Sequence, residues 1–169
     1  MSGDMLESIS PTDWGAICEV EEGFTWEEFG VNSQDDFFAH IEKVVKINWG
    51  KHAVGARAVQ IRIGAACDYA QKSSGPVPYL FAAMLPSRTD KDDAYSLTPR
   101  STGWISPELI IDGSPVQLCA DPRFVRVRGA AQTSSFKVLG RIREQLLMEL
   151  VSSVSQHGSR PGIVQFRAK

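Results

Sequence analysis

The stretch YLFAAML, residues 79–85, is apolar at every position and decides the fold class. A continuous apolar run of this length is typical of a central strand in a sheet. The preceding segment SSGPVP, residues 73–78, is rich in turn-forming residues and predicts a loop. Further toward the N-terminus, apolar and polar side chains alternate from Val59 to Ile63, which predicts a half-buried strand.

On the C-terminal side, a polar segment is followed by further strand signals. Residues 86–103 form a polar stretch longer than most loops in compact domains, which predicts a mobile loop or a functional insert. The dipeptide Asp112-Gly113 stands between two apolar runs and predicts a hairpin. The sequence RFVRVRG, residues 123–129, alternates valine with arginine and predicts another strand.

Two segments show the apolar spacing of amphipathic helices. The first, residues 33–50, begins with a variant of the capping box and ends at a glycine. The second is predicted from residue 134 to residue 156, with Gly140 as a weak point inside it. Its apolar stripe is expected to contain Phe136, Leu139, Ile142, Leu146, Leu150 and Val154.

Shorter signals complete the order of elements. GAICEVEE, residues 15–22, predicts a short strand, residues 24–31 are expected to be irregular, and GIVQFRAK, residues 162–169, predicts a final strand. The whole order predicts an α+β fold, a mostly antiparallel sheet with two main helices packed on one side of it. We expect a single compact domain over residues 15–169, preceded by an N-terminal segment of residues 1–14.

The net charge of −2 hides a strong asymmetry along the chain. Residues 1–50 contain 11 acidic and 2 basic side chains, whereas residues 121–169 contain 3 acidic and 9 basic ones. The two ends can neutralise each other inside one fold. Alternatively, the acidic end of one molecule can attract the basic end of the next.

The sequence carries no catalytic or metal-binding signature. The three histidines stand far apart, and none has a second metal ligand at helical spacing. Cys18 and Cys119 lie in apolar runs, where a thiol is usually a small buried hydrophobe. Nucleotide-binding glycine loops and the nucleophile-elbow motif are absent. We therefore expect a protein that is not an enzyme and needs no cofactor or metal.

Membrane and secretion signals are also absent from the sequence. No window of 18 residues is apolar throughout, and the N-terminus lacks the basic and apolar regions of a signal peptide. The three widely spaced cysteines favour a reducing compartment. These features predict a cytoplasmic location.

Two candidate contact surfaces follow from the charge pattern. The first alternates glutamates with aromatic side chains, as protein interfaces do. Its predicted self-association residues are Glu21, Glu22, Trp26, Glu27, Glu28 and Phe29. The second is a basic surface for a polyanion or an acidic partner. Its predicted contact residues are Arg126, Arg128, Lys137 and Arg141. The alternatives are aromatic side chains that cover one end of the core and arginines on a solvated strand face.

The order of elements resembles that of rhabdovirus matrix proteins, including the short ones of plant-infecting members. EVEEGFTWEEFGVNSQDDFFAHIEKVVKINWGK is similar to their opening strand, connection and helix, and it contains Trp49-Gly50 near its end. AVQIRIGAA and YLFAAMLP are similar to their next strands. RFVRVRG and FKVLGRIREQLLMELVSSV are similar to their last strand and long helix. The acidic N-terminus departs from the basic one common in that family, so contact with a membrane stays open.

The resemblance covers residues 15–155 and implies a viral structural protein of matrix type in the virion and the host cytoplasm. Such a protein bridges nucleocapsid and envelope, or neighbouring copies, without enzymatic activity. The expected partners are further copies of the chain, arranged head to tail, and nucleocapsid or RNA, with no small-molecule substrate. Two alternatives remain, an RNA-binding coat protein and a small viral regulatory module such as a suppressor of host defence.

Overall fold

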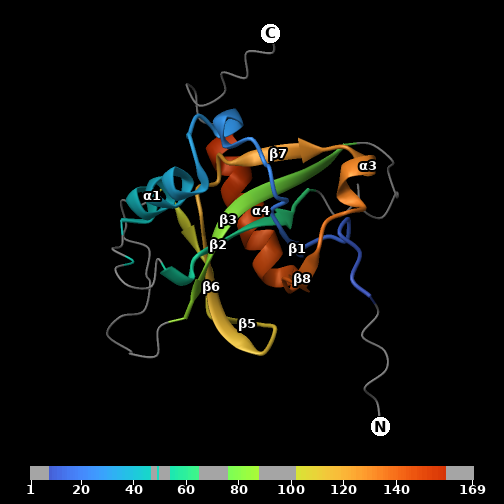
Figure 1. The fold of residues 1–169 in the computed structure, drawn as a ribbon. Coiled ribbons are helices and arrows are strands. Elements are labelled where there is room, and N and C mark those ends of the chain that lie inside the picture. Colours follow the sequence, from blue (N-terminus) through green and yellow to red (C-terminus); the bar gives the residue numbers. More distant parts are fainter. Residues whose placement is uncertain (1–7, 47–48, 50–53, 65–75, 88–101, 159–169) are drawn as a thin grey trace.

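The computed structural model describes residues 8–46, 49, 54–64, 76–87 and 102–158. Within these ranges the chain forms an eight-stranded sheet in which every pairing is antiparallel, with helices packed against it (Figure 1). The strands are β1 Ala16–Glu19, β2 Arg57–Arg62, β3 Val77–Pro86, β4 Trp104–Ile105, β5 Leu109–Ile111, β6 Ser114–Ala120, β7 Val125–Arg128 and β8 Val138–Arg141. The helices are the 3₁₀ helix η1 Trp26–Phe29, α1 Gln34–Val45, α3 Ala130–Thr133 and α4 Glu144–Gly158. The predicted α+β class is confirmed.

Strand β3 is the centre of the sheet, as the apolar run at residues 79–85 predicts. It pairs with β2 along most of its length, with β7 at its first half and with β6 at its second half. The strand order is β4-β6-β3-β2-β1-β8, with β5 attached to β6 and β7 attached to β3. Strands β4, β5, β7 and β8 each pair with one neighbour only, so each has one unpaired edge among the described residues.

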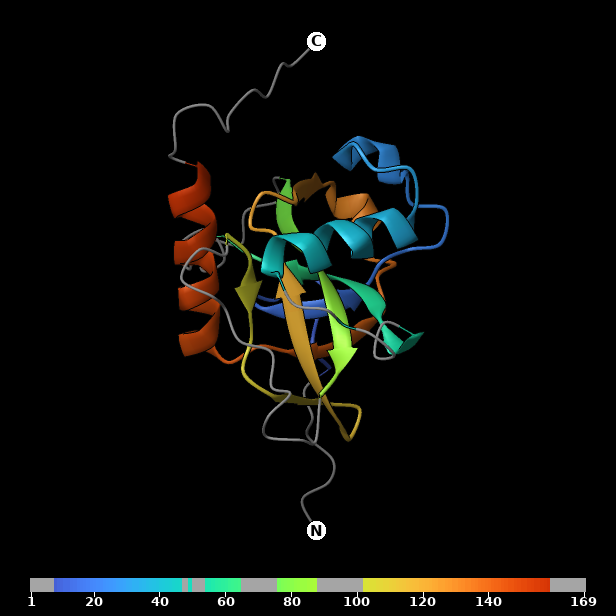
Figure 2. The same cartoon turned by 90° about the vertical axis from the view of Figure 1, so that its left-hand side faces the viewer.

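Alternate residues of β3 point into two different cores. Leu80, Ala82 and Met84 lie in the core that α4 covers, whereas the neighbouring Tyr79 and Phe81 lie in the core that α1 covers. The sheet is therefore buried on both faces, which accounts for the absence of polar residues in this strand. Figure 2 shows α4 and α1 on opposite sides of the sheet. The prediction that both helices pack on one side is wrong.

The predicted helix over residues 134–156 is also wrong in its first half. Residues Val138–Arg141 form β8, which pairs with β1, and α4 begins at Glu144. Phe136 lies in the α1-side core, whereas Leu139 and Ile142 lie in the α4-side core. Side chains that enter opposite faces of a sheet cannot form one helical stripe, although their spacing along the sequence fits a helix.

Several local predictions are confirmed by the described residues. The Ser33 hydroxyl accepts a hydrogen bond from the Asp36 N–H at 3.1 Å, which caps the start of α1. The turn between β5 and β6 is the two-residue Asp112-Gly113, with positive φ at both positions. Such a conformation fits the right-handed twist of the flanking strands. Residues 24–31 depart from the expectation of irregular structure, because they contain the short helix η1.

Some predictions lie outside the described residues. These concern most of the polar loop at residues 86–103, the final strand at residues 162–169, and the end of the first helix near Gly50. In the part of the chain that is described, no helix combines the length and apolar character required to cross a bilayer.

Candidate functional site

Two residues of the predicted basic surface, Arg126 and Arg128, contact the chain's own acidic segment. Arg126 on β7 forms an ion pair with the Glu28 carboxylate at 2.8 Å and donates a second hydrogen bond to the Glu28 carbonyl at 3.0 Å. Arg128 on the same strand pairs with Glu21. Gln60 also donates to the Glu21 carboxylate, at 3.1 Å. Acidic and basic ends of the sequence thus neutralise each other at these positions.

Both arginines also lie against aromatic rings. The Arg126 guanidinium is 5.5 Å from the centre of the Phe29 ring, and that of Arg128 is 5.3 Å from Phe24 and 5.2 Å from Phe136. Arg128 is only 7% exposed, and burial lowers the pKa of its guanidinium. A side chain in this position stabilises the fold through its ion pair and its ring contacts.

The aromatic side chains predicted for self-association pack onto the α1-side core. Trp26 and Phe29 are half-buried, with ring centres 4.8 Å and 6.4 Å from that of Phe37. Phe29 also stacks on Phe124 at 5.0 Å. This geometry fits the alternative that the aromatics cover one end of the core. Of the predicted acidic residues, Glu22, Glu27 and Glu28 are exposed.

The other predicted basic residues lie on β8 and just before it. The Lys137 ammonium is 3.6 Å from the Glu19 carboxylate, on an exposed surface. Arg141 is exposed, and its Nε donates to the Trp14 carbonyl at 2.9 Å. The predicted basic set is therefore split between β7, which faces the acidic segment, and the edge strand β8.

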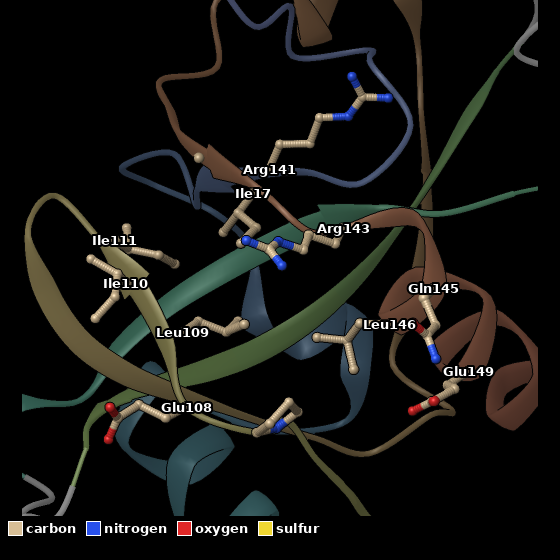
Figure 3. A pocket seen from close by; sticks show the side chains of 12 residues that line it. Ile17, Glu108, Leu109, Ile110, Ile111, Arg141, Arg143, Gln145, Leu146 and Glu149 are labelled. Carbon is tan, nitrogen blue, oxygen red and sulfur yellow. The ribbon is translucent and has the colours of Figure 1, made fainter.

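A pocket of about 600 Å³ lies beside β8 and is the candidate functional site. Residues 107–111, which include β5, line one side of it (Figure 3). Gly140 and Arg141 on β8 and the first turns of α4 line the other side, and Ile17 on β1 also contributes. Figure 3 shows Leu109 and Leu146 approaching each other across the pocket from these two sides.

The pocket combines an apolar interior with a charged rim. Leu109 and Leu146 are half-buried, and Ile110 on β5 is 67% exposed. Glu108 and Glu149 stand on the rim, and the Arg143 side chain reaches toward Ile17 (Figure 3). The Arg143 guanidinium has no acidic or hydrogen-bonding partner within the described ranges. An apolar centre rimmed by charges of both signs is the composition of a protein-binding surface.

The backbone of β5 offers hydrogen-bonding groups to this pocket. Ile110 lies opposite Pro115, whose carbonyl accepts a hydrogen bond from the Ser87 N–H at 2.9 Å on the β3 side. In an antiparallel pair, such a position leaves the N–H and C=O of the opposite residue pointing away from the partner strand. The Ile110 backbone groups therefore face the free edge of β5.

The chemically reactive side chains of the described residues lie elsewhere. Burial raises the pKa of the Cys18 and Cys119 thiols to about 12, so neither is a thiolate near neutral pH. His40 is half-buried, and its Nε2 lies 2.9 Å from the Asp121 carboxylate. Arg123 forms a bidentate contact with the same carboxylate.

The Asp121 carboxylate is fully buried within this cluster. Burial alone would raise its pKa, but the hydrogen bonds from Arg123 and His40 offset that effect and hold the pKa below its usual range. The cluster joins α1 to the connection between β6 and β7. Its carboxylate is engaged on both oxygens, so the arrangement is suited to stabilising the fold.

No protein-family model, curated protein or solved structure matches this chain. The geometry of the pocket is therefore the basis for a functional proposal. Sequence reasoning missed this pocket because it placed β8 inside a helix, which concealed a free sheet edge. Gly140, an unfavourable residue for a helix interior, was the one signal against that helix.

Proposed function

We propose that this chain is a non-enzymatic, self-associating structural protein of matrix type, whose copies join through the pocket between β5 and α4. The observation that carries the proposal is the open apolar pocket beside the edge of β5 that no other described strand pairs with. An exposed sheet edge next to apolar side chains is a ready template for pairing with another chain. The resemblance to rhabdovirus matrix proteins points to the same class of function, although the segment likened to their long helix divides into β8 and α4.

The pairing of Glu21 with Arg128 and of Glu28 with Arg126 moves the proposed contact away from the acidic segment. These carboxylates and guanidinium groups already have partners within one chain. The pocket, by contrast, exposes the side chain of Ile110 and the guanidinium of Arg143, which has no acidic partner among the described residues. It is therefore the surface that we propose for contact with a neighbouring copy.

Sedimentation velocity over a range of concentrations tests this function. We expect the average sedimentation coefficient of the wild-type protein to rise with concentration, and to fall modestly at high salt because rim charges are screened. The substitution Leu146→Gln, in the pocket, should abolish the rise. The control is Met148→Gln on the same helix, because Met148 is 58% exposed and does not line the pocket.

Three results would contradict the proposal. A wild-type protein that stays monomeric at every concentration is not a self-associating structural protein. Large species that absorb strongly at 260 nm and disappear after nuclease treatment would indicate an RNA-binding coat protein instead. A discrete small oligomer that Leu146→Gln leaves unchanged would favour the regulatory module.

A further inference from the structure

We propose that the pocket receives the segment GIVQFRAK, residues 162–169, of a second copy, which adds a strand to the free edge of β5. This inference rests on the self-association proposed above and names the segment that makes the contact. Residues 162–169 lie outside the described part of the chain, and their sequence is the property that matches the pocket.

The first match is between backbones. The N–H and C=O of Ile110 face away from β6 and border the pocket. An extended peptide beside β5 can pair with both groups, as peptides do when they add a strand to an open sheet edge. Such pairing requires no particular side chain, so the choice of occupant depends on the apolar and charged groups around it.

The second match is between side chains. In an extended strand, alternate residues point to opposite faces. In residues 162–169 one face carries Val164, Phe166 and Ala168, and all three are apolar. The proposed strand directs this face toward Leu109 and Leu146, the half-buried leucines of the pocket. Its other face, which includes Gln165, remains toward solvent.

The third match is between charges. The Glu108 carboxylate stands at the start of β5, and the Glu149 carboxylate stands across the pocket from it on α4, whereas Arg143 reaches toward Ile17 (Figure 3). Residues 159–169 contain three basic side chains and no acidic one, and two of these, Arg167 and Lys169, lie near the end of the segment. A strand antiparallel to β5 brings that basic end beside Glu108 and Glu149, and its apolar start beside Arg143.

The direction of this strand indicates a second copy as its source. Helix α4 begins beside the pocket and ends at Gly158, and Glu149 is the pocket residue nearest that end along the helix. Three residues after Gly158 reach about 11 Å at most. The chain's own segment would therefore enter beside Glu149 and carry Arg167 toward Arg143, against the charges. A segment from another molecule can enter from the opposite side.

A matched pair of full-length variants tests the inference by sedimentation velocity. Phe166→Asp places a carboxylate on the face that enters the pocket, and Gln165→Asp places one on the solvent face. We expect Phe166→Asp to abolish self-association and Gln165→Asp to preserve it. Both residues lie outside the described fold, and circular dichroism should show that the two variants melt at the same temperature as the wild type.

Peptide binding supplies the second readout. A fluorescent peptide of sequence GIVQFRAK, added to the Phe166→Asp protein, should bind, and replacing its phenylalanine with alanine should weaken binding about tenfold or more. The substitution Leu146→Gln in the same protein should abolish peptide binding, whereas Met148→Gln should leave it unchanged.

The outcomes separate the inference from the proposed function. If the wild type self-associates and Phe166→Asp has no effect, the segment is not the occupant and the proposed function stands. If the wild type is monomeric at every concentration, the proposed function is wrong, whatever the peptide binds. If the peptide binds Phe166→Asp but the wild type is monomeric, the pocket holds the chain's own segment, and the claim of a second copy is overturned.

Discussion

Arg126 on β7 binds Glu28 of η1 twice, through the side-chain carboxylate and the main-chain carbonyl, although 98 residues separate them in the sequence. Two residues further along β7, Arg128 forms an ion pair with Glu21. The acidic beginning and the basic end of the chain are thus joined at β7. The arginine row is engaged within the chain, and the surface that we propose for a partner is the pocket instead.

The two ion pairs should differ in their contribution to stability. Glu21→Gln leaves the nearly buried Arg128 guanidinium without its carboxylate, and we expect the free energy of unfolding to fall by about 1.5–3 kcal/mol. Glu28→Gln acts on a more exposed pair and should cost about 0–1 kcal/mol. Urea unfolding of both variants measures the difference. Equal losses would mean that burial does not distinguish the two pairs.

Trp26 is expected to stabilise the fold by packing on the α1-side core. Its ring contacts those of Phe24 and Phe37, with centres 5.0 Å and 4.8 Å away. Trp26→Ala should lower the free energy of unfolding by about 2–4 kcal/mol, toward the low end for large aromatics because the residue is half-buried. Chemical denaturation together with sedimentation checks this. A variant of unchanged stability that fails to associate would instead place Trp26 in an interface.

Leu150 and Leu146 occupy different environments on α4. Leu150 is fully buried against the sheet, so Leu150→Ala should cost about 2–5 kcal/mol of stability. Leu146 is half-buried on the wall of the pocket, so Leu146→Ala should cost less than Leu150→Ala. Thermal and urea unfolding of the pair measure both effects. A larger loss at Leu146 would contradict the burial that separates these residues.

Asp121 makes stability depend on pH. Its pKa in the folded protein lies below the unfolded value of about 3.9, so the carboxylate stabilises the fold above that value. This contribution is lost as the pH falls through the lower, folded pKa. We expect the stability difference between the wild type and Asp121→Asn to be largest near neutral pH and to shrink below about pH 4. A difference that stays constant down to pH 2 would contradict the assignment.

Local sequence patterns were sufficient to predict the centre of the fold. The apolar run of β3, the Asp112-Gly113 turn and the cap at Ser33 each depend on nearby residues, and each is confirmed. The apolar run also carries information about how the sheet is covered. A strand without polar positions is covered on both faces, so it already indicated helices on opposite sides of the sheet.

The wrong predictions concern places where a strand directly precedes a helix, or where segments far apart in the sequence come into contact. Leu139, Ile142, Leu146 and Leu150 fit one helical stripe, yet β8 ends at Arg141 and α4 begins at Glu144. Hydrophobic periodicity cannot reveal a boundary between a strand and a helix when apolar residues keep their helical spacing across it. The pairing of Glu28 with Arg126 depends on the position of β7 beside β3, which no local pattern specifies. The pocket likewise exists only once β5 and α4 are placed together.

Mixing two defective variants tests the central claim, that a segment of one copy fills the pocket of the next. The Leu146→Gln variant keeps the segment but has a damaged pocket, and the Phe166→Asp variant keeps the pocket but has a damaged segment. Light scattering after size exclusion should find each variant monomeric alone. An equimolar mixture should contain a complex of twice the mass of one chain, with one copy of each variant. A mixture in which both variants remain monomeric, while the wild type associates, would contradict the account.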